Sequence, residues 1–257
     1  CLKSDWCMVA RDRSTCICAR ICEGSERAVG EAGYLHRLTS STERVRHYEP
    51  FHPREEKRRD FGDMAMLLQQ AATATIVKDS AERLGVSVQS LRELGVGYHA
   101  VAGCLSFPMW DEEGCCGIRL RRIDDGFKYA MLGSRNGVFC SGNGCVPIIV
   151  EGPTDAAAAL TMGFSAVIGR PFCKGGNPIV SAMLDAMYPD TVIIVADTDA
   201  VGLDGATKLA DQLCDAHDVR LIEPTDGAKD MRAWLRLGAT KDDVLEVAAN
   251  VDRWRKQ

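Results

Sequence analysis

The chain has 257 residues and a formal net charge of −5, with 46% hydrophobic and 26% charged residues. This composition is ordinary for a soluble globular protein, and no apolar run approaches the roughly 20 residues that a membrane-spanning helix needs. We therefore expect no membrane association and a cytoplasmic location. The acidic charge does not indicate nucleic-acid binding but excludes little, because a cation-binding site needs local acidity.

The first 38 residues are rich in cysteine and arginine. Five of the twelve cysteines fall within the first 22 residues. They are Cys1, Cys7, Cys16, Cys18 and Cys22. Because the rest of the sequence is typical of a cytosolic α/β protein, we expect reduced thiols, with this early cluster on a metal. The first residue is not Met, so we also expect a fragment or processed form of a longer chain.

Residues 39–60 are polar and charged, carry two prolines, and are typical of a linker. A globular pattern follows. Residues 64–77 favour one helix, and residues 80–98 favour two short helices broken at Gly85 and Gly95.

A regular alternation of strand and helix begins after residues 100–145, where short strand-like pieces meet at turns predicted at "DEEG" and "DDG". Four apolar runs each precede a helical pattern. They are residues 146–150, 166–169, 191–196 and 219–223. Such a pattern predicts an α/β fold with a parallel sheet covered on both faces. The third helix has one apolar face for packing on the sheet. It consists of Leu203, Ala206, Ala210 and Leu213.

Acidic residues follow two of these runs. "VPIIV" leads into Glu151, and "TVIIVA" leads into Asp197 and Asp199. In open parallel sheets, ligands bind beyond the carboxyl ends of the strands. Asp155, four residues after Glu151, lies on the same face of the helix that Pro153 can begin. Converging carboxylates repel one another, so we expect these four acids to hold Mg²⁺ or Mn²⁺; helix capping is the alternative for each acid alone.

"VEGPTDAAAALTMGF…VIGR" followed by "VIIVADTDAVGLDGA" resembles the TOPRIM domain, which bacterial-type primases, topoisomerases, some nucleases and some recombination proteins share. The resemblance covers about residues 146–237. It implies a Rossmann-like parallel sheet in which Glu151, Asp197 and Asp199 bind Mg²⁺ and act in catalysis.

The preceding "LSFPMWDEEGCCGIRLRRIDDGFKYAMLGSRNGVF" resembles the polymerase subdomain of bacterial and phage DNA primases. The family's arginine, lysine-tyrosine pair and phenylalanine fall on Arg121, Lys128, Tyr129 and Phe139. Arg119 is the alternative alignment for the arginine. The resemblance implies that these cations bind template or nucleotide, against the alternative of a solvated strand face. "GAKDMRAWL" is similar to the segment that closes primase TOPRIM modules, which implies a nucleotide-binding role for Lys229, although the family's final aspartate is absent.

Primases of this type carry a zinc ribbon, which the resemblance places at residues 1–38. Structural zinc needs four Cys or His ligands. We rank Cys1, Cys7 and Cys18 first, with Cys22 as the fourth ligand and Cys16 as its alternate; unligated thiols are the other interpretation. Aromatic and basic side chains between the thiols suit contact with single-stranded DNA. They are Trp6, Arg11, Arg13 and Arg20.

The whole pattern predicts a DNA primase that makes short RNA primers on single-stranded DNA from ribonucleoside triphosphates, with Mg²⁺ and Zn²⁺ as cofactors. A replicative helicase is a further candidate partner. The predicted domains are a zinc ribbon (1–38), a linker (39–60), an N-terminal polymerase subdomain (61–145), a TOPRIM domain (146–237) and a C-terminal helix (238–257).

Two alternatives stay open. A TOPRIM nuclease would use the same acids to cut nucleic acid without nucleotides, and would leave the Arg121 and Lys128 segment unexplained. A non-enzymatic recombination mediator would pair a zinc module with TOPRIM for DNA binding alone, and would not need the three acids together.

Overall fold

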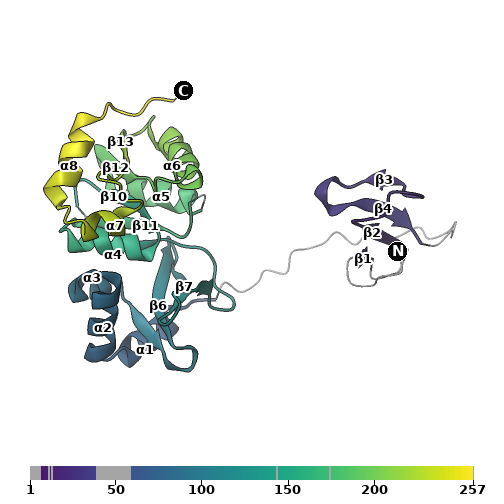
Figure 1. The fold of residues 1–257 in the computed structure, drawn as a ribbon, viewed down its shortest axis with the longest axis horizontal. Helices are drawn as coiled ribbons and strands as arrows, with labels where there is room; N and C mark the ends of the chain where they lie inside the picture. Colours follow the sequence, from purple (N-terminus) through teal and green to yellow (C-terminus); the bar gives the residue numbers. More distant parts are fainter. Residues whose placement is uncertain are drawn as a thin grey trace. The chain divides into compact units, whose positions relative to one another are not determined.

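The computed structural model divides into two compact units, Cys1–Arg54 and Glu55–Gln257 (Figure 1). It describes residues 7–10, 12, 14–38, 59–142, 144–173 and 175–256. Cys1, Trp6, Arg11, Arg13 and residues 39–58 of the predicted linker lie outside the described residues. Within the described ranges, no helix has the length and apolar character needed to cross a membrane.

The N-terminal unit is a four-stranded antiparallel sheet with the order β1-β2-β4-β3. Its strands are β1 (Cys7–Val9), β2 (Thr15–Cys18), β3 (Arg27–Ala28) and β4 (Tyr34–Arg37), with a 3₁₀ turn at Gly30–Ala32. Gly33 precedes β4 at φ +110°, where a side chain would collide with the Cys18 carbonyl. Among the described residues of this unit, Cys18 alone is buried. The unit therefore has almost no apolar core of its own.

Three helices open the C-terminal unit: α1 (Gly62–Ala71), α2 (Ala74–Leu84) and α3 (Val88–Glu93). The prediction of one helix over residues 64–77 is wrong, because Ala72 is extended and the Thr73 side chain accepts a hydrogen bond from the Ile76 N–H and begins a new helix. Gly85, left-handed at φ +71°, ends α2, as its position in the sequence predicted.

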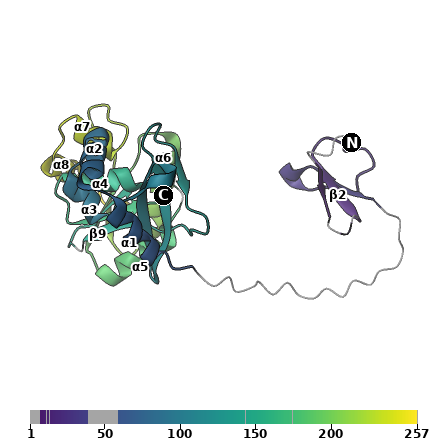
Figure 2. The same ribbon diagram turned by 90° about the horizontal axis from the view of Figure 1, so that it is seen from below.

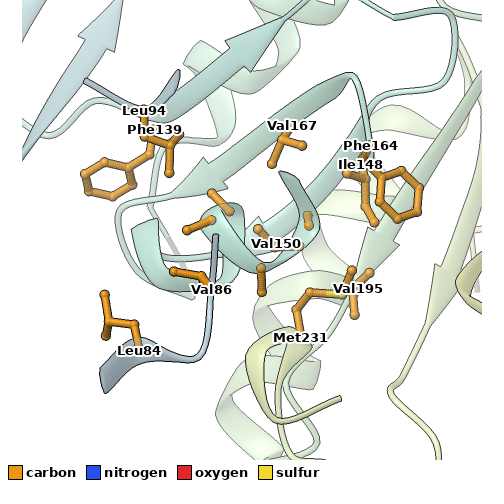
Figure 3. Packing of buried hydrophobic residues seen from close by; sticks show 14 of the residues in the cluster. Leu84, Val86, Leu94, Phe139, Ile148, Val150, Phe164, Val167, Val195 and Met231 are labelled. Carbon is orange, nitrogen blue, oxygen red and sulfur yellow. The ribbon is translucent and has the colours of Figure 1, made fainter. Parts of the chain in front are cut away.

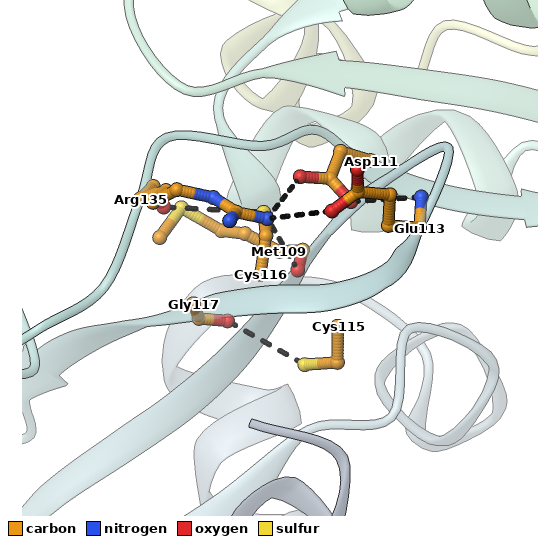
Figure 4. A network of polar contacts seen from close by, with 7 residues as sticks. All are labelled: Met109, Asp111, Glu113, Cys115, Cys116, Gly117 and Arg135. Atoms are coloured by element: carbon orange, nitrogen blue, oxygen red, sulfur yellow. Dashed lines mark hydrogen bonds and ion pairs between the residues drawn. The ribbon is translucent and has the colours of Figure 1, made fainter. Parts of the chain in front are cut away.

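A four-stranded antiparallel sheet follows, with the order β5-β6-β7-β8. Its strands are β5 (Gly97–His99), β6 (Cys104–Asp111), β7 (Gly114–Arg122) and β8 (Lys128–Ala130), with a 3₁₀ turn at Ala100–Ala102. The turn predicted at "DEEG" joins β6 to β7. Figure 4 shows the Arg135 guanidinium beside it, donating to Asp111 at 2.7 Å, with Glu113 at 3.8 Å. This ion pair holds the loop after β8 against the hairpin.

The second sheet of this unit has the order β13-β12-β10-β11-β9. Its strands are β9 (Phe139–Gly142), β10 (Ile148–Glu151), β11 (Ala166–Arg170), β12 (Thr191–Val195) and β13 (Asp218–Ile222). Four strands run parallel, which confirms the predicted parallel sheet, and β9 pairs antiparallel with β11. The antiparallel edge strand was not predicted.

Helices cover both faces of this sheet, with α8 (Lys241–Asn250), α7 (Met231–Arg236) and α4 (Pro153–Thr161) on one side and α6 (Ala200–Leu213) and α5 (Asn177–Met187) on the other (Figure 1). Side chains alternate along β10, so that Ile148 and Val150 pack toward α4 (Figure 3) while Ile149 packs toward α6. Because α3 also packs on α4 (Figures 1 and 2), both sheets of the unit share one continuous apolar cluster.

Helix α6 packs on the sheet with a face slightly different from the predicted one. Ala206, Ala210 and Leu213 are buried as expected, but Leu203 is 37% exposed. The buried face also includes Gly202 and Gly205, and at Gly205 a side chain would collide with the Cys173 carbonyl. A close approach of α6 to the segment after β11 thus requires glycine here.

Candidate active site

The carboxyl ends of β10 and β12 bring three of the predicted acids into one electrostatic cluster. Glu151 ends β10, and Gly152 at φ +84° turns the chain into α4, whose first turn carries Asp155. Asp197 follows β12, and its pKa is raised by the charges of Asp155 and Glu151 as well as by burial. Glu151 and Asp197 are 46 positions apart in the sequence, yet the charge of one affects the pKa of the other. Their positions at neighbouring strand ends predicted this proximity.

The pKa values of these acids report the cost of placing them together. Burial, then repulsion by Asp155 and Glu151, raises the pKa of Asp197 to about 7. Burial and the neighbouring Asp230 raise the pKa of Asp155 to about 6. Burial also raises the pKa of Glu151 above its ordinary range. Carboxylates that gain protons so readily in a folded protein are short of positive charge.

One cation of the chain already lies in this cluster, and sequence reasoning missed it. Arg170 ends β11 directly opposite Glu151 in the parallel register. It is only 2% exposed, and its Nη1 donates to the Gly205 carbonyl of α6 at 3.1 Å. Its charge lowers the pKa of Glu151, against the larger effect of burial. The sequence did offer a signal for Arg170, which is a charged residue at the end of an otherwise apolar strand. Because β10 and β11 are parallel, both strands end at the same sheet edge, so this charge lies beside Glu151.

Two buried polar atoms here have no hydrogen-bond partner within the described part of the chain. They are Oε2 of Glu151 and Nε of Arg170. An unsatisfied buried carboxylate oxygen is costly, so its presence indicates a missing partner. For Glu151, a cation is the partner that the chemistry of the atom favours.

The structure gives Asp199 a capping role. Its Oδ1 accepts from the Val201 N–H at 3.0 Å and the Gly202 N–H at 2.7 Å, so the side chain begins α6. This is the alternative that the sequence left open for each acid. Asp199 also contributes to the raised pKa of Asp197, and both capping bonds use the same oxygen. Capping therefore leaves the Asp199 charge within reach of the cluster.

A further acid joins the cluster from the start of α7. Asp230 is 7% exposed, caps α7 through the Ala233 N–H at 2.6 Å, and raises the pKa of both Asp155 and Asp197. Asp155 in turn accepts from the Arg232 N–H at 3.0 Å. Asp230 lies in the segment "GAKDMRAWL", but nothing in the sequence indicated that it belongs to the metal site.

As they stand, no three His, Cys, Asp or Glu side chains of the described ranges are arranged to hold a metal ion. The donor set nevertheless fits a hard divalent cation. It consists of carboxylate oxygens only, it includes the unpartnered Oε2 of Glu151, and its pKa values are raised by mutual repulsion.

The predicted cations differ in their relation to the acids. Lys128 on β8 pairs with Arg121 on β7, and the charges of Asp155 and Glu151 both act on Lys128. Burial, followed by Arg121, lowers the pKa of Lys128. Asp155 also acts on Arg121. The antiparallel sheet therefore presents an exposed lysine and a half-buried arginine to the acidic cluster.

The other two predicted cations are less engaged. Arg119 contacts Asn136 at 3.5 Å, and burial lowers its pKa without any resolved effect of an acid. The Lys229 side chain is 76% exposed and lies 3.6 Å from Asp230. Its carbonyl accepts from the Thr198 N–H at 3.0 Å, between Asp197 and Asp199. Lys229 thus supports the loop after β12 through its backbone.

In the N-terminal unit, two of the predicted zinc ligands meet. Cys7 and Cys18 pair across β1 and β2, and their thiols share a hydrogen bond. Backbone N–H groups of Arg20 and Ile21 lower the pKa of Cys18, while the bond to Cys18 raises that of Cys7. Cys16 faces His36 across β2 and β4, and Cys22 is exposed. Cys1 lies outside the described residues.

The C-terminal unit thus combines a mainly parallel five-stranded sheet, an antiparallel four-stranded sheet, and an acidic cluster that lies beside cations of the antiparallel sheet. No protein-family model and no curated protein matches the chain. Solved structures of primase catalytic cores do share its fold. A DnaG primase catalytic domain bound to single-stranded DNA has 15% sequence identity and a TM-score of 0.59, over 74% of this chain and 79% of that chain.

The Escherichia coli primase catalytic core has 15% identity and a TM-score of 0.58, over 74% of this chain and 78% of that chain. A DNA primase domain from Pseudomonas aeruginosa has 14% identity and a TM-score of 0.56, over 73% and 76%. The chain therefore has the fold of a primase catalytic core.

Proposed function

We propose that the protein is a DNA primase that synthesises short RNA primers on single-stranded DNA from ribonucleoside triphosphates. The observation that carries the proposal is the cluster of Glu151, Asp155 and Asp197 beside Lys128 and Arg121, within a primase-like fold. The acids can bind divalent ions, and the neighbouring cations can bind phosphates. Together they suit a substrate that carries phosphates and divalent ions.

In this proposal Glu151, Asp197 and Asp199 supply oxygen ligands for Mg²⁺ or Mn²⁺, and Asp155 supports them from α4. When bound, the cation supplies Lewis acidity that activates a primer 3′-hydroxyl and neutralises charge on the leaving pyrophosphate. Lys128 and Arg121 orient template or triphosphate by charge-assisted hydrogen bonds. The charge of Arg170 opposes the effect of burial on the pKa of Glu151, and its side chain holds α6 in position through the Gly205 carbonyl.

We further propose that the C-terminal unit comprises a polymerase subdomain over residues 61–145 and a TOPRIM domain over residues 146–237. The N-terminal unit would be a zinc ribbon, with Cys7 and Cys18 as two of its ligands. Two findings support the ribbon: the paired thiols, and the nearly absent core, since units this small often need a metal to fold. A structure of the Aquifex aeolicus primase is described as containing zinc-binding and RNA polymerase domains.

Primer synthesis with labelled ribonucleotides, Mg²⁺ and single-stranded DNA tests the proposal. Glu151→Gln and Asp197→Asn should each lower synthesis about a hundredfold or more, since each removes a charge that acts on the reacting phosphates. Asp185→Asn, an exposed acid on α5, is the matched control and should synthesise normally. Undiminished synthesis by both site variants would refute the assignment, and degradation of labelled DNA without nucleotides would favour the nuclease.

A further inference from the structure

A second cationic feature lies beside the acidic cluster but contains none of its acids. It is a pocket of about 340 Å³ between α2, the β7–β8 turn and α7. We call it the arginine pocket. Its charged lining residues are Arg83, Arg121, Arg122, Arg232, Arg236, Asp124 and Asp125. Only Arg121 among these was assigned a role above.

The lining carries a large positive excess. Five arginines face two aspartates, which leaves a net charge of +3 (5 − 2). Asp125 is already used, because it pairs with Arg122 at 2.7 Å. Among the residues that the structure describes, no carboxylate lies within ion-pair distance of the other four arginines, which are Arg83, Arg121, Arg232 and Arg236.

Two of these four arginines are fixed to the frame of the pocket. Arg83 on α2 donates to the Ile123 carbonyl at 3.1 Å, and Arg236 on α7 donates to the Arg83 carbonyl at 2.8 Å. These bonds join α2, the β7–β8 turn and α7 through guanidinium groups. The walls are thus held together by the side chains that make them cationic.

The other two guanidiniums have no such partner. The side chains of Arg121 and Arg232 make no hydrogen bond to any described residue. The two like charges also repel each other: burial, and then the charge of Arg232, lower the pKa of Arg121. Gly126, at φ +74°, makes room for Arg121, because a side chain there would lie 2.8 Å from its Nη2. Unpaired, half-buried cations converging on one cavity indicate an absent anion.

We propose that the arginine pocket binds the polyphosphate group of a nucleotide. Guanidinium groups recognise phosphate oxygens through paired, charge-assisted hydrogen bonds, and the charge excess suits a ligand with several negative charges. A cavity of this size is at the small end for nucleotide-sized ligands, which suits a polyphosphate more than a whole nucleotide.

The pocket also adjoins the acidic cluster, since the Arg232 N–H donates to Asp155. Resting on the proposed function, we assign this polyphosphate to the nucleotide that begins a primer. That nucleotide keeps its 5′-triphosphate, because only its 3′-hydroxyl reacts. With the triphosphate in the arginine pocket, the 3′-hydroxyl would react at the acidic cluster, which adjoins the pocket at Asp155.

Calorimetric binding to the full chain in EDTA tests the pocket without involving divalent ions. Wild type should bind inorganic tripolyphosphate and ATP more tightly than AMP. Arg232→Gln and Arg121→Gln should each weaken tripolyphosphate binding about tenfold, as expected for loss of a charged hydrogen-bond donor. Arg92→Gln, which removes an exposed arginine on α3, should bind like wild type.

Equal binding by wild type and both pocket variants would overturn the proposal. An oligodeoxythymidine with a 5′-hydroxyl end provides a further arm. If it binds as tightly as tripolyphosphate and loses affinity in Arg232→Gln, the pocket serves strand phosphates, and the assignment to a nucleotide is wrong. Thermal melting of each variant shows whether it is folded, and two separate arginines are replaced so that one unfolded variant does not end the test.

Failure of the pocket and failure of the proposed function give different results. Asp197→Asn should still bind tripolyphosphate in EDTA although it makes no primer. In primer synthesis, Arg232→Gln should raise the KM for the first nucleotide and reduce the preference for a triphosphate over a monophosphate at that position. If wild type synthesises primers while Arg232→Gln keeps this preference, the pocket assignment is wrong and the primase proposal stands.

Discussion

Asp197 carries the strongest electrostatic conflict of the candidate active site. It lies between a sheet whose strands are apolar and four other acids, and its pKa of about 7 reflects both conditions. A carboxylate in this state gains from any cation that reaches it, because the cation removes repulsion as well as forming a bond. The repulsion between Asp197 and its neighbouring acids thus destabilises the fold and also favours metal binding.

The first prediction concerns pH. In buffer with EDTA, the free energy of unfolding should fall as pH rises from about 4 to about 7. The folded-state pKa of Asp197 lies above its ordinary value of 3.8, so in this window the native state holds a proton that the unfolded state has lost. Urea titrations across the window measure the slope. Asp197→Asn should flatten it, and a variant with the wild-type slope would contradict the expectation.

Arg170 is the counterpart of these acids, and its removal is the second prediction. Arg170→Gln should lower the free energy of unfolding by about 3 kcal/mol, because it leaves the half-buried Glu151 without its cation and removes the bond to the Gly205 carbonyl. Mg²⁺ should restore part of this loss. Chemical denaturation with and without Mg²⁺ measures both effects, and Arg92→Gln serves as the surface control. A loss no greater than that of the control would show that Arg170 does not support the site.

Helix α6 shows how one residue can serve an element and a site together. Asp199 caps the helix with two backbone hydrogen bonds and adds its charge to the acidic cluster. The sequence could not separate these roles, because an aspartate before a helix is typical of both. They differ in what they need: capping needs an oxygen acceptor, whereas metal binding needs the negative charge.

A pair of substitutions separates the two roles and forms the third prediction. Asp199→Asn keeps the acceptor and should leave stability nearly unchanged, whereas Asp199→Ala should lower it by about 1 kcal/mol. If the charge acts in catalysis, both variants should lose primer synthesis. Thermal melting and the primer assay are measured on the same samples. Normal synthesis by Asp199→Asn would restrict this residue to capping.

At the scale of the whole molecule, the two units differ in how they are stabilised. The C-terminal unit has apolar clusters on both faces of its parallel sheet. The described part of the N-terminal unit has Cys18 as its one buried side chain. A sheet of this size with so little core needs another source of stability, and thiolate coordination of zinc is the source that its cysteines favour.

The fourth prediction follows from this contrast. The purified protein should contain zinc, and a strong chelator should unfold the N-terminal unit while leaving the C-terminal unit folded. Cys18→Ser should have the same effect, because it removes a central thiol, whereas Cys145→Ser, at an exposed thiol of the other unit, should not. Metal analysis and limited proteolysis check this. Retention of the N-terminal unit in the Cys18 variant without zinc would refute the ribbon.

Local features were predictable from the sequence to the extent that they depend on neighbouring residues. The four parallel strands and the helices between them follow from apolar runs and helical periodicity, and the acids at two strand ends follow from their position in those runs. Errors arose where a local signal competed with another one: Thr73 divides the helix predicted over residues 64–77, and the buried face of α6 includes Gly202 and Gly205 but not Leu203.

The alternation of strands and helices, and the strand ends that carry Glu151 and Asp197, could be predicted from the sequence because burial patterns are properties of short segments. Three arrangements became visible only in the folded chain: β9 joins the parallel sheet in the opposite direction, Arg170 lies opposite Glu151, and α2 and α7 enclose the arginine pocket. These arrangements pair segments far apart in the chain, and their geometry depends on how whole elements pack, which no short stretch of sequence records.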